Sequence, residues 1–87
     1  MAHASQSSLC GVQIRAARGA LRWSVEDLAE RSGVSGSTIK RIEATEGAPK
    51  STAPNLMAIR STLEAEGIEF IGSLNDRPGI RMARAKP

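Results

Sequence analysis

Residues 27–43, DLAERSGVSGSTIKRIE, decide the fold, because a run of small residues separates two helix-forming segments. Gly33 tolerates the positive φ that ends a helix, and Ala29 is small enough for two helix backbones to approach. Val34, directly after Gly33, and Ile39, further on, supply apolar residues that can pack against the first helix. This spacing predicts a tight corner between two packed helices, and not one continuous helix.

The two helices at the corner have clear start signals. Ser24 is a good N-cap for the first, with Asp27 three residues later in the position of a capping box. Ser35 is the predicted N-cap of the second. Ile39 and Ile42 follow at a three-residue spacing, so we expect both to face inward.

An earlier helix is predicted from near Leu9 to Leu21, with Ser8 or Cys10 as its N-cap; Cys10 would place Gln13 at the third helical position. One face of this helix carries the residues at i, i+3, i+4 and i+7, namely Ile14, Ala17, Arg18 and Leu21. Arg18 is therefore a charge on an apolar stripe, and it needs a partner.

A fourth helix is predicted to begin at Ser51 or Thr52 and to stop at Gly67. Its apolar edge consists of Leu56, Ile59 and Leu63, and Pro54 is tolerated in its first turn. The segments IEFIG (68–72) and GIRMA (79–83) are short and β-prone, and the turn-rich SLNDRP (73–78) separates them. This pattern predicts a small hairpin.

The chain of 87 residues is long enough for one domain. We expect a mainly α bundle of about four helices over residues 9–67, including a helix-turn-helix, followed by a β-hairpin at 68–83. Residues 1–8 are predicted to be a flexible end, and residues 84–87 a basic tail.

The composition favours an anionic partner over a membrane or a catalytic reaction. The formal net charge is +3, and no apolar run approaches the ~20 residues that span a bilayer. Cys10 is the single cysteine, which excludes an internal disulfide and fits a reducing cytoplasm. His3 is the single histidine, and GVSGST is no phosphate loop. We therefore expect no metal, no cofactor and no enzymatic activity.

Residues 13–43, QIRAARGALRWSVEDLAERSGVSGSTIKRIE, and 55–71, NLMAIRSTLEAEGIEFI, resemble the phage-repressor-like (Cro/repressor, or XRE-type) helix-turn-helix transcription regulators. The resemblance extends over about Leu9 to Phe70. It implies a lambda-repressor-like bundle whose third helix lies in the major groove of double-stranded DNA, with a homodimer on paired half-sites.

The resemblance assigns base reading to Gly36, Ser37 and Arg41, with Thr38 and Lys40 as further DNA contacts. It also implies a structural ion pair between Arg18 and Glu43.

The residue pattern agrees in part with these assignments. Inward Ile39 and Ile42 direct Ser37, Lys40 and Arg41 outward. Arg41 can donate two hydrogen bonds to guanine, and Lys40 is suited to phosphate.

Other polar residues near the predicted third helix have weaker assignments. Ser35 and Thr38 lie near its N-terminus, where hydroxyls and backbone N–H groups bind phosphate. Lys50 is either a DNA-backbone contact or a solvated side chain. Arg15 and Arg22 are interpreted as surface residues, and Trp23 as a core residue between the first two helices.

Two features differ from the family pattern and keep alternatives open. The family usually has Gln where this chain has Val25, and Gly36 brings no side chain to the third helix. One alternative is an antitoxin that binds DNA and also covers a small toxin protein. Another is a protein-interaction module that has lost DNA contact.

Overall fold

The computed structural model describes residues 9–45, 53–73 and 76–82. It confirms the predicted fold class of four helices and a C-terminal hairpin. The elements in chain order are α1 (Gly11–Leu21), α2 (Val25–Ser32), α3 (Gly36–Ala44), α4 (Ala53–Ala65), β1 (Ile68–Ser73) and β2 (Asp76–Met82). The predicted flexible end 1–8, the helix-four start at Ser51 or Thr52, and the basic tail 84–87 lie outside the described residues.

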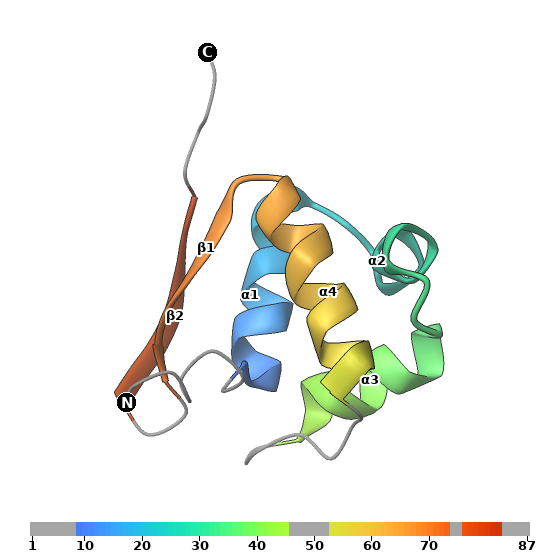
Figure 1. Ribbon diagram of the computed structural model, residues 1–87, viewed down its shortest axis with the longest axis horizontal. Coiled ribbons are helices and arrows are strands. Elements are labelled where there is room, and N and C mark those ends of the chain that lie inside the picture. Colours follow the sequence, from blue (N-terminus) through green and yellow to red (C-terminus); the bar gives the residue numbers. More distant parts are fainter. Residues whose placement is uncertain (1–8, 46–52, 74–75, 83–87) are drawn as a thin grey trace.

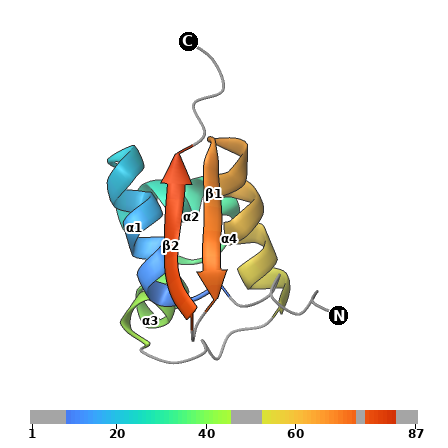
Figure 2. The ribbon, with the colours of Figure 1, turned by 90° about the vertical axis from the view of Figure 1, so that its left-hand side faces the viewer.

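The hairpin stands along one side of the helical bundle (Figure 1). Figure 2 shows β2 beside α1 and β1 beside α4, and both pairs of elements are in contact. α2 packs on α3 and α4, and it lies on the side of the bundle away from the hairpin (Figure 1). The order of layers is therefore hairpin, then α1 and α4, then α2 with the beginning of α3.

One apolar core joins every element except β2, whose Ile80 is partly buried against it. The inward faces predicted for α1, α3 and α4 are confirmed. The buried members of the core are Leu9, Ile14, Ala17, Leu28, Val34, Ile39, Ile42, Ile59, Leu63 and Ile68. Complete burial of such an aliphatic side chain contributes about 1.5–3 kcal/mol. Burial of this set therefore fixes the relative placement of the helices.

Side-chain caps begin the first two helices. Cys10, and not Ser8, is the N-cap of α1, and Gln13 Oε1 accepts from the Cys10 N–H at 3.1 Å. Ser24 and Asp27 form the predicted capping box of α2, with bonds of 2.9 and 3.0 Å. The bonds to the Ser24 N–H and then to its hydroxyl lower the pKa of the Asp27 carboxyl, since both favour the charged form.

The hairpin is antiparallel, and Ile71 lies opposite Gly79. β2 already begins at Asp76, within the segment predicted as a turn, so that part of the prediction was wrong. The ladder is irregular between Ile71 and Ser73, and Arg77 has a φ of +50°. The bulged register lets residues typical of turns continue the strand.

Gln13 fixes the hairpin to the helices from a buried position. Its Nε2 donates to the Ile71 carbonyl at 2.9 Å and to the Gly79 carbonyl at 3.0 Å, and its side chain is 2% exposed. An isolated two-stranded ribbon is marginally stable in water. The Gln13 bonds and the contacts with α1 and α4 make the hairpin part of the domain.

Gly33 provides the first test of the fold. It ends α2 with φ +81° and ψ 5°, and a Cβ added there would meet no atom within 4 Å. The cost of a substitution is therefore backbone strain alone, roughly 1–2 kcal/mol. Gly33→Val should lower the free energy of unfolding, measured in urea, by at least this much, since a β-branched residue resists positive φ. Gly33→Asn should lose clearly less, and equal stability of the two variants would contradict the left-handed corner.

Candidate nucleic-acid interface

The corner between α2 and α3 occupies Gly33 to Ser35. Val34, in its middle, is 4% exposed and belongs to the core. Its N–H donates to the Ser32 hydroxyl at 3.2 Å. The corner is thus held by an apolar contact and by a hydrogen bond, and α3 leaves it as a separate helix packed on α2.

The structure brings three of the predicted site residues onto the outer side of α3. Ser37, Lys40 and Arg41 are exposed, whereas Ile39 and Ile42 are 0% and 1% exposed. Positions i, i+3 and i+4 lie on one face of a helix, so the three polar side chains share a surface. Gly36 and Thr38 are half-buried beside them, and Lys50 lies outside the described residues.

Three hydroxyls gather at the N-terminus of α3. Ser35 Oγ accepts from the Thr38 N–H at 3.2 Å and lies 2.9 Å from Thr38 Oγ1. Ser37 Oγ lies 3.4 Å from Ser35 Oγ. Hydroxyls and unpaired N–H groups in the first turn of a helix suit phosphate oxygens. This end of α3 therefore carries the kind of donor groups that bind phosphate oxygens in other proteins.

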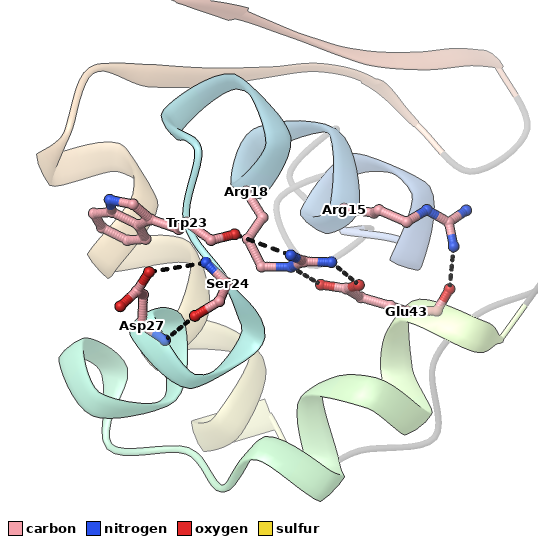
Figure 3. A network of polar contacts seen from close by, with 6 residues as sticks. All are labelled: Arg15, Arg18, Trp23, Ser24, Asp27 and Glu43. Carbon is pink, nitrogen blue, oxygen red and sulfur yellow. Dashed lines mark hydrogen bonds and ion pairs between the residues drawn. The ribbon is translucent and has the colours of Figure 1, made fainter.

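The other end of α3 is held by Arg18 (Figure 3). Arg18 Nε and Nη2 donate to the two carboxylate oxygens of Glu43 at 2.8 and 2.9 Å. Arg18 Nη1 donates to the Trp23 carbonyl at 2.9 Å. The Arg18 side chain is 19% exposed and that of Glu43 is 8% exposed. The hydrogen bond to Glu43 raises the pKa of Arg18, so the guanidinium stays protonated.

Two contacts that the sequence did not predict also join α1 to the end of α3. Arg15 Nη1 lies 3.4 Å from the Glu43 carbonyl oxygen (Figure 3). A Cβ added to Gly11 would lie 2.9 Å from that oxygen and closer still to the Ile42 carbonyl oxygen. The glycine therefore allows the start of α1 to touch the last turn of α3. A small residue on a helix is visible in the sequence, but its distant partner is not.

The remaining predicted residues have packing contacts. Trp23 was predicted as a core residue, but it is only half-buried and packs against the edge of the core; the Arg31 guanidinium lies 4.4 Å from its ring centre. Val25 is half-buried at the first position of α2, and its Cγ1 would lie 3.5 Å from a Cβ on Gly36. Val25 thus packs in the corner, and Gly36 has room for a methyl group.

α2 and α3 are joined by a tight corner. The end of α3 is held by Arg18, and its outer face is polar. These features define a helix-turn-helix unit. The sequence model of a family described as a helix-turn-helix domain matches residues 10–64, and the chain belongs to that family. The family indicates a DNA-binding regulator. The searches of curated proteins and of solved structures returned no match. Within the described part of the chain, no helix is long and apolar enough to cross a bilayer.

Gly11 and Gly19 form a matched pair of glycines on α1. A Cβ on Gly19 would meet nothing within 4 Å, so Gly19→Ala should gain up to ~1 kcal/mol from helix propensity. Gly11→Ala should instead lose about 1–3 kcal/mol, since the carbonyls of α3 must move away. Thermal and urea unfolding of both variants measure the difference. A stabilising Gly11→Ala would refute the close contact.

Glu43 and Glu64 provide a second matched pair. Glu64 forms an exposed i,i+4 ion pair with Arg60 at 3.0 Å, and Glu64→Ala should cost less than about 0.5 kcal/mol. Glu43→Ala leaves the Arg18 guanidinium mostly buried without its carboxylate, and should cost roughly 2–3 kcal/mol. Denaturant unfolding compares the two. Similar small losses would show that the Arg18–Glu43 pair does not hold α3.

Proposed function

We propose that this protein is a small cytoplasmic transcription regulator, most simply a repressor, that binds specific double-stranded DNA sequences as a homodimer. The observation that carries the proposal is the outward presentation of Ser37, Lys40 and Arg41 on a helix anchored at its other end by Arg18. In this proposal α3 enters the major groove and the chain performs no catalysis.

Each polar group of α3 has a distinct role in the proposal. Arg41 donates two hydrogen bonds to the O6 and N7 atoms of a guanine, worth about 1–3 kcal/mol of discrimination. Lys40 neutralises a phosphate as a point charge. Ser35, Ser37 and Thr38 donate to phosphate or base edges at the N-terminus of the helix. Phosphate contacts supply most of the affinity, and Arg41 with Ser37 supplies the selection of sequence.

Rigidity of α3 supports recognition, because a pre-ordered helix loses little conformational entropy on binding. Arg18 and Gly11 tie its last turn to α1, and the Ser35 cap defines its first turn. Gly36 adds no side chain at the surface and permits a close approach to DNA. With few long side chains available to read bases, part of the selectivity would come from DNA shape.

An antitoxin that binds DNA and covers a toxin is a second candidate. The observation in its favour is apolar exposure on the hairpin, where Ile71 is 37% and Met82 is 48% exposed. Co-purification of a second small protein with the chain would support it. A protein-interaction module without DNA contact is the third candidate, favoured by Val25 in place of a phosphate-binding residue.

Selection of duplexes from a random library by the purified protein tests the first candidate. Arg41→Ala should reduce the preference at one base pair per half-site by about 5- to 150-fold, and leave the melting temperature unchanged. Lys40→Ala should weaken binding to all DNA sequences alike, and should reduce the slope of log affinity against log salt concentration by about 0.9.

Two results would overturn the proposal. Binding that does not change with salt would exclude phosphate contacts. If Arg41→Ala lost the same affinity for every DNA sequence, base reading by this residue would be excluded.

A further inference from the structure

The two bonds of Gln13 reveal which way the hairpin backbone faces. Ile71 and Gly79 are opposite each other in the register, and one nitrogen lies 2.9 and 3.0 Å from their two carbonyl oxygens. Both carbonyls must therefore point into the space between the strands. In an antiparallel ladder the direction alternates along each strand. The N–H and C=O groups of Phe70 and Ile68 consequently face away from β2, along the outer edge of β1.

The two outer edges of the hairpin differ in their capacity to accept another strand. In β2, Pro78 has no N–H and Arg77 has a left-handed φ of +50°. Proline and irregular backbone are features that block strand addition. β1 is regular from Ile68 to Ile71, and no third strand pairs with it in the described residues.

An open groove follows the free edge of β1. Its volume is about 600 Å³, and it is lined by Arg60 and Glu64 of α4 and by residues 67–71. The Arg60 guanidinium lies 5.3 Å from the ring centre of Phe70. The groove gives a further strand access to the outward N–H and C=O groups of β1.

We propose that β1 of a second copy of this chain occupies this edge, antiparallel to the first, and that the two hairpins form one four-stranded sheet. The outer edge of an antiparallel strand is complementary to itself, since a residue on a two-fold axis donates to its own copy and accepts from it. The occupant is a second copy because the proposed function, on which this inference rests, requires two α3 helices on one duplex.

Charge selects the register. Centring the two-fold axis on Glu69 would place two carboxylates directly opposite each other, which is destabilising. Centring it on Phe70 places Glu69 opposite Ile71 of the second copy and also pairs the outward backbone groups. The dimer is therefore centred on Phe70, which brings the half-exposed Ile71 into the interface.

The arrangement of layers agrees with paired recognition helices. The two-fold axis of such a sheet is perpendicular to its plane, so the helices of both copies stay on the same side of it. α2 and the beginning of α3 lie on the side of the bundle away from the hairpin (Figures 1 and 2). The beginnings of both α3 helices thus lie on the side of the dimer away from the four-stranded sheet.

Substitutions of opposite charge at Ile71 test the interface without DNA. Ile71 lies opposite Gly79 in its own hairpin, so Ile71→Lys and Ile71→Glu face no intrachain side chain across the strands. In the dimer, Lys would attract and Glu would repel Glu69 of the second copy. Sedimentation should show a parent dimer, with Ile71→Lys dimerising about tenfold or more tightly than Ile71→Glu. Equal dimerisation of the two variants, or a monomeric parent, would overturn the proposal.

Disulfide trapping tests the register. Glu69→Cys chains mixed with Ile71→Cys chains should form a covalent heterodimer under mild oxidation, and neither variant alone should do so to the same extent. The parent chain, whose Cys10 is 4% exposed, is the control. Failure of the mixture to cross-link would refute the Phe70-centred register. A strand of another protein found in the groove of a monomeric chain would refute the second copy as occupant.

The same measurements separate this inference from the proposed function. Arg41→Ala should dimerise like the parent while its DNA preference changes. A parent dimer that binds no DNA, together with cysteine variants that cross-link as expected, would refute the DNA-binding function and support the interface. Specific DNA binding by a monomeric parent would refute the interface alone.

Discussion

The guanidinium of Arg18 is the contact on which the functional geometry depends. It joins α1 to both carboxylate oxygens of Glu43 and to the Trp23 carbonyl, so one side chain ties the end of α3 to the loop before α2. Exchanging such a mostly buried pair for apolar residues can be neutral, whereas removing one partner is costly. In this domain the Arg18–Glu43 pair mainly fixes the orientation of α3 relative to α1. Two hydrogen bonds to one carboxylate define that orientation, whereas apolar packing alone would leave it adjustable.

A chain of buried contacts extends from this pair to the hairpin. Gly11 lets the start of α1 touch the last turn of α3, and two residues later Gln13 binds both strands. α1 is therefore the element through which α3 and the hairpin are placed relative to each other. This arrangement suits a protein whose proposed DNA-reading helix and proposed dimer edge lie on different sides of a small domain.

Local sequence patterns predicted the parts of the fold that depend on neighbouring residues. The caps at Ser24 and Ser35, the corner at Gly33 and the inward Ile39 follow from spacing and from backbone preferences. Contacts between distant residues could not be predicted in this way. Gln13 and Ile71 are 58 positions apart, and only the folded helix brings the amide to the strands. For the site, periodicity indicated the outer face of α3, whereas the Glu43 partner of Arg18 was implied by family resemblance.

Titration of a selected duplex into the isotope-labelled protein, followed by backbone amide chemical shifts, tests the central claim most directly. The account predicts that the largest shifts fall on residues 35–41, that Ile39 moves less than Arg41, and that the exposed face of the hairpin is unaffected. Shifts centred on the hairpin, with α3 unchanged, would contradict the claim that the outer face of α3 is the surface that binds DNA.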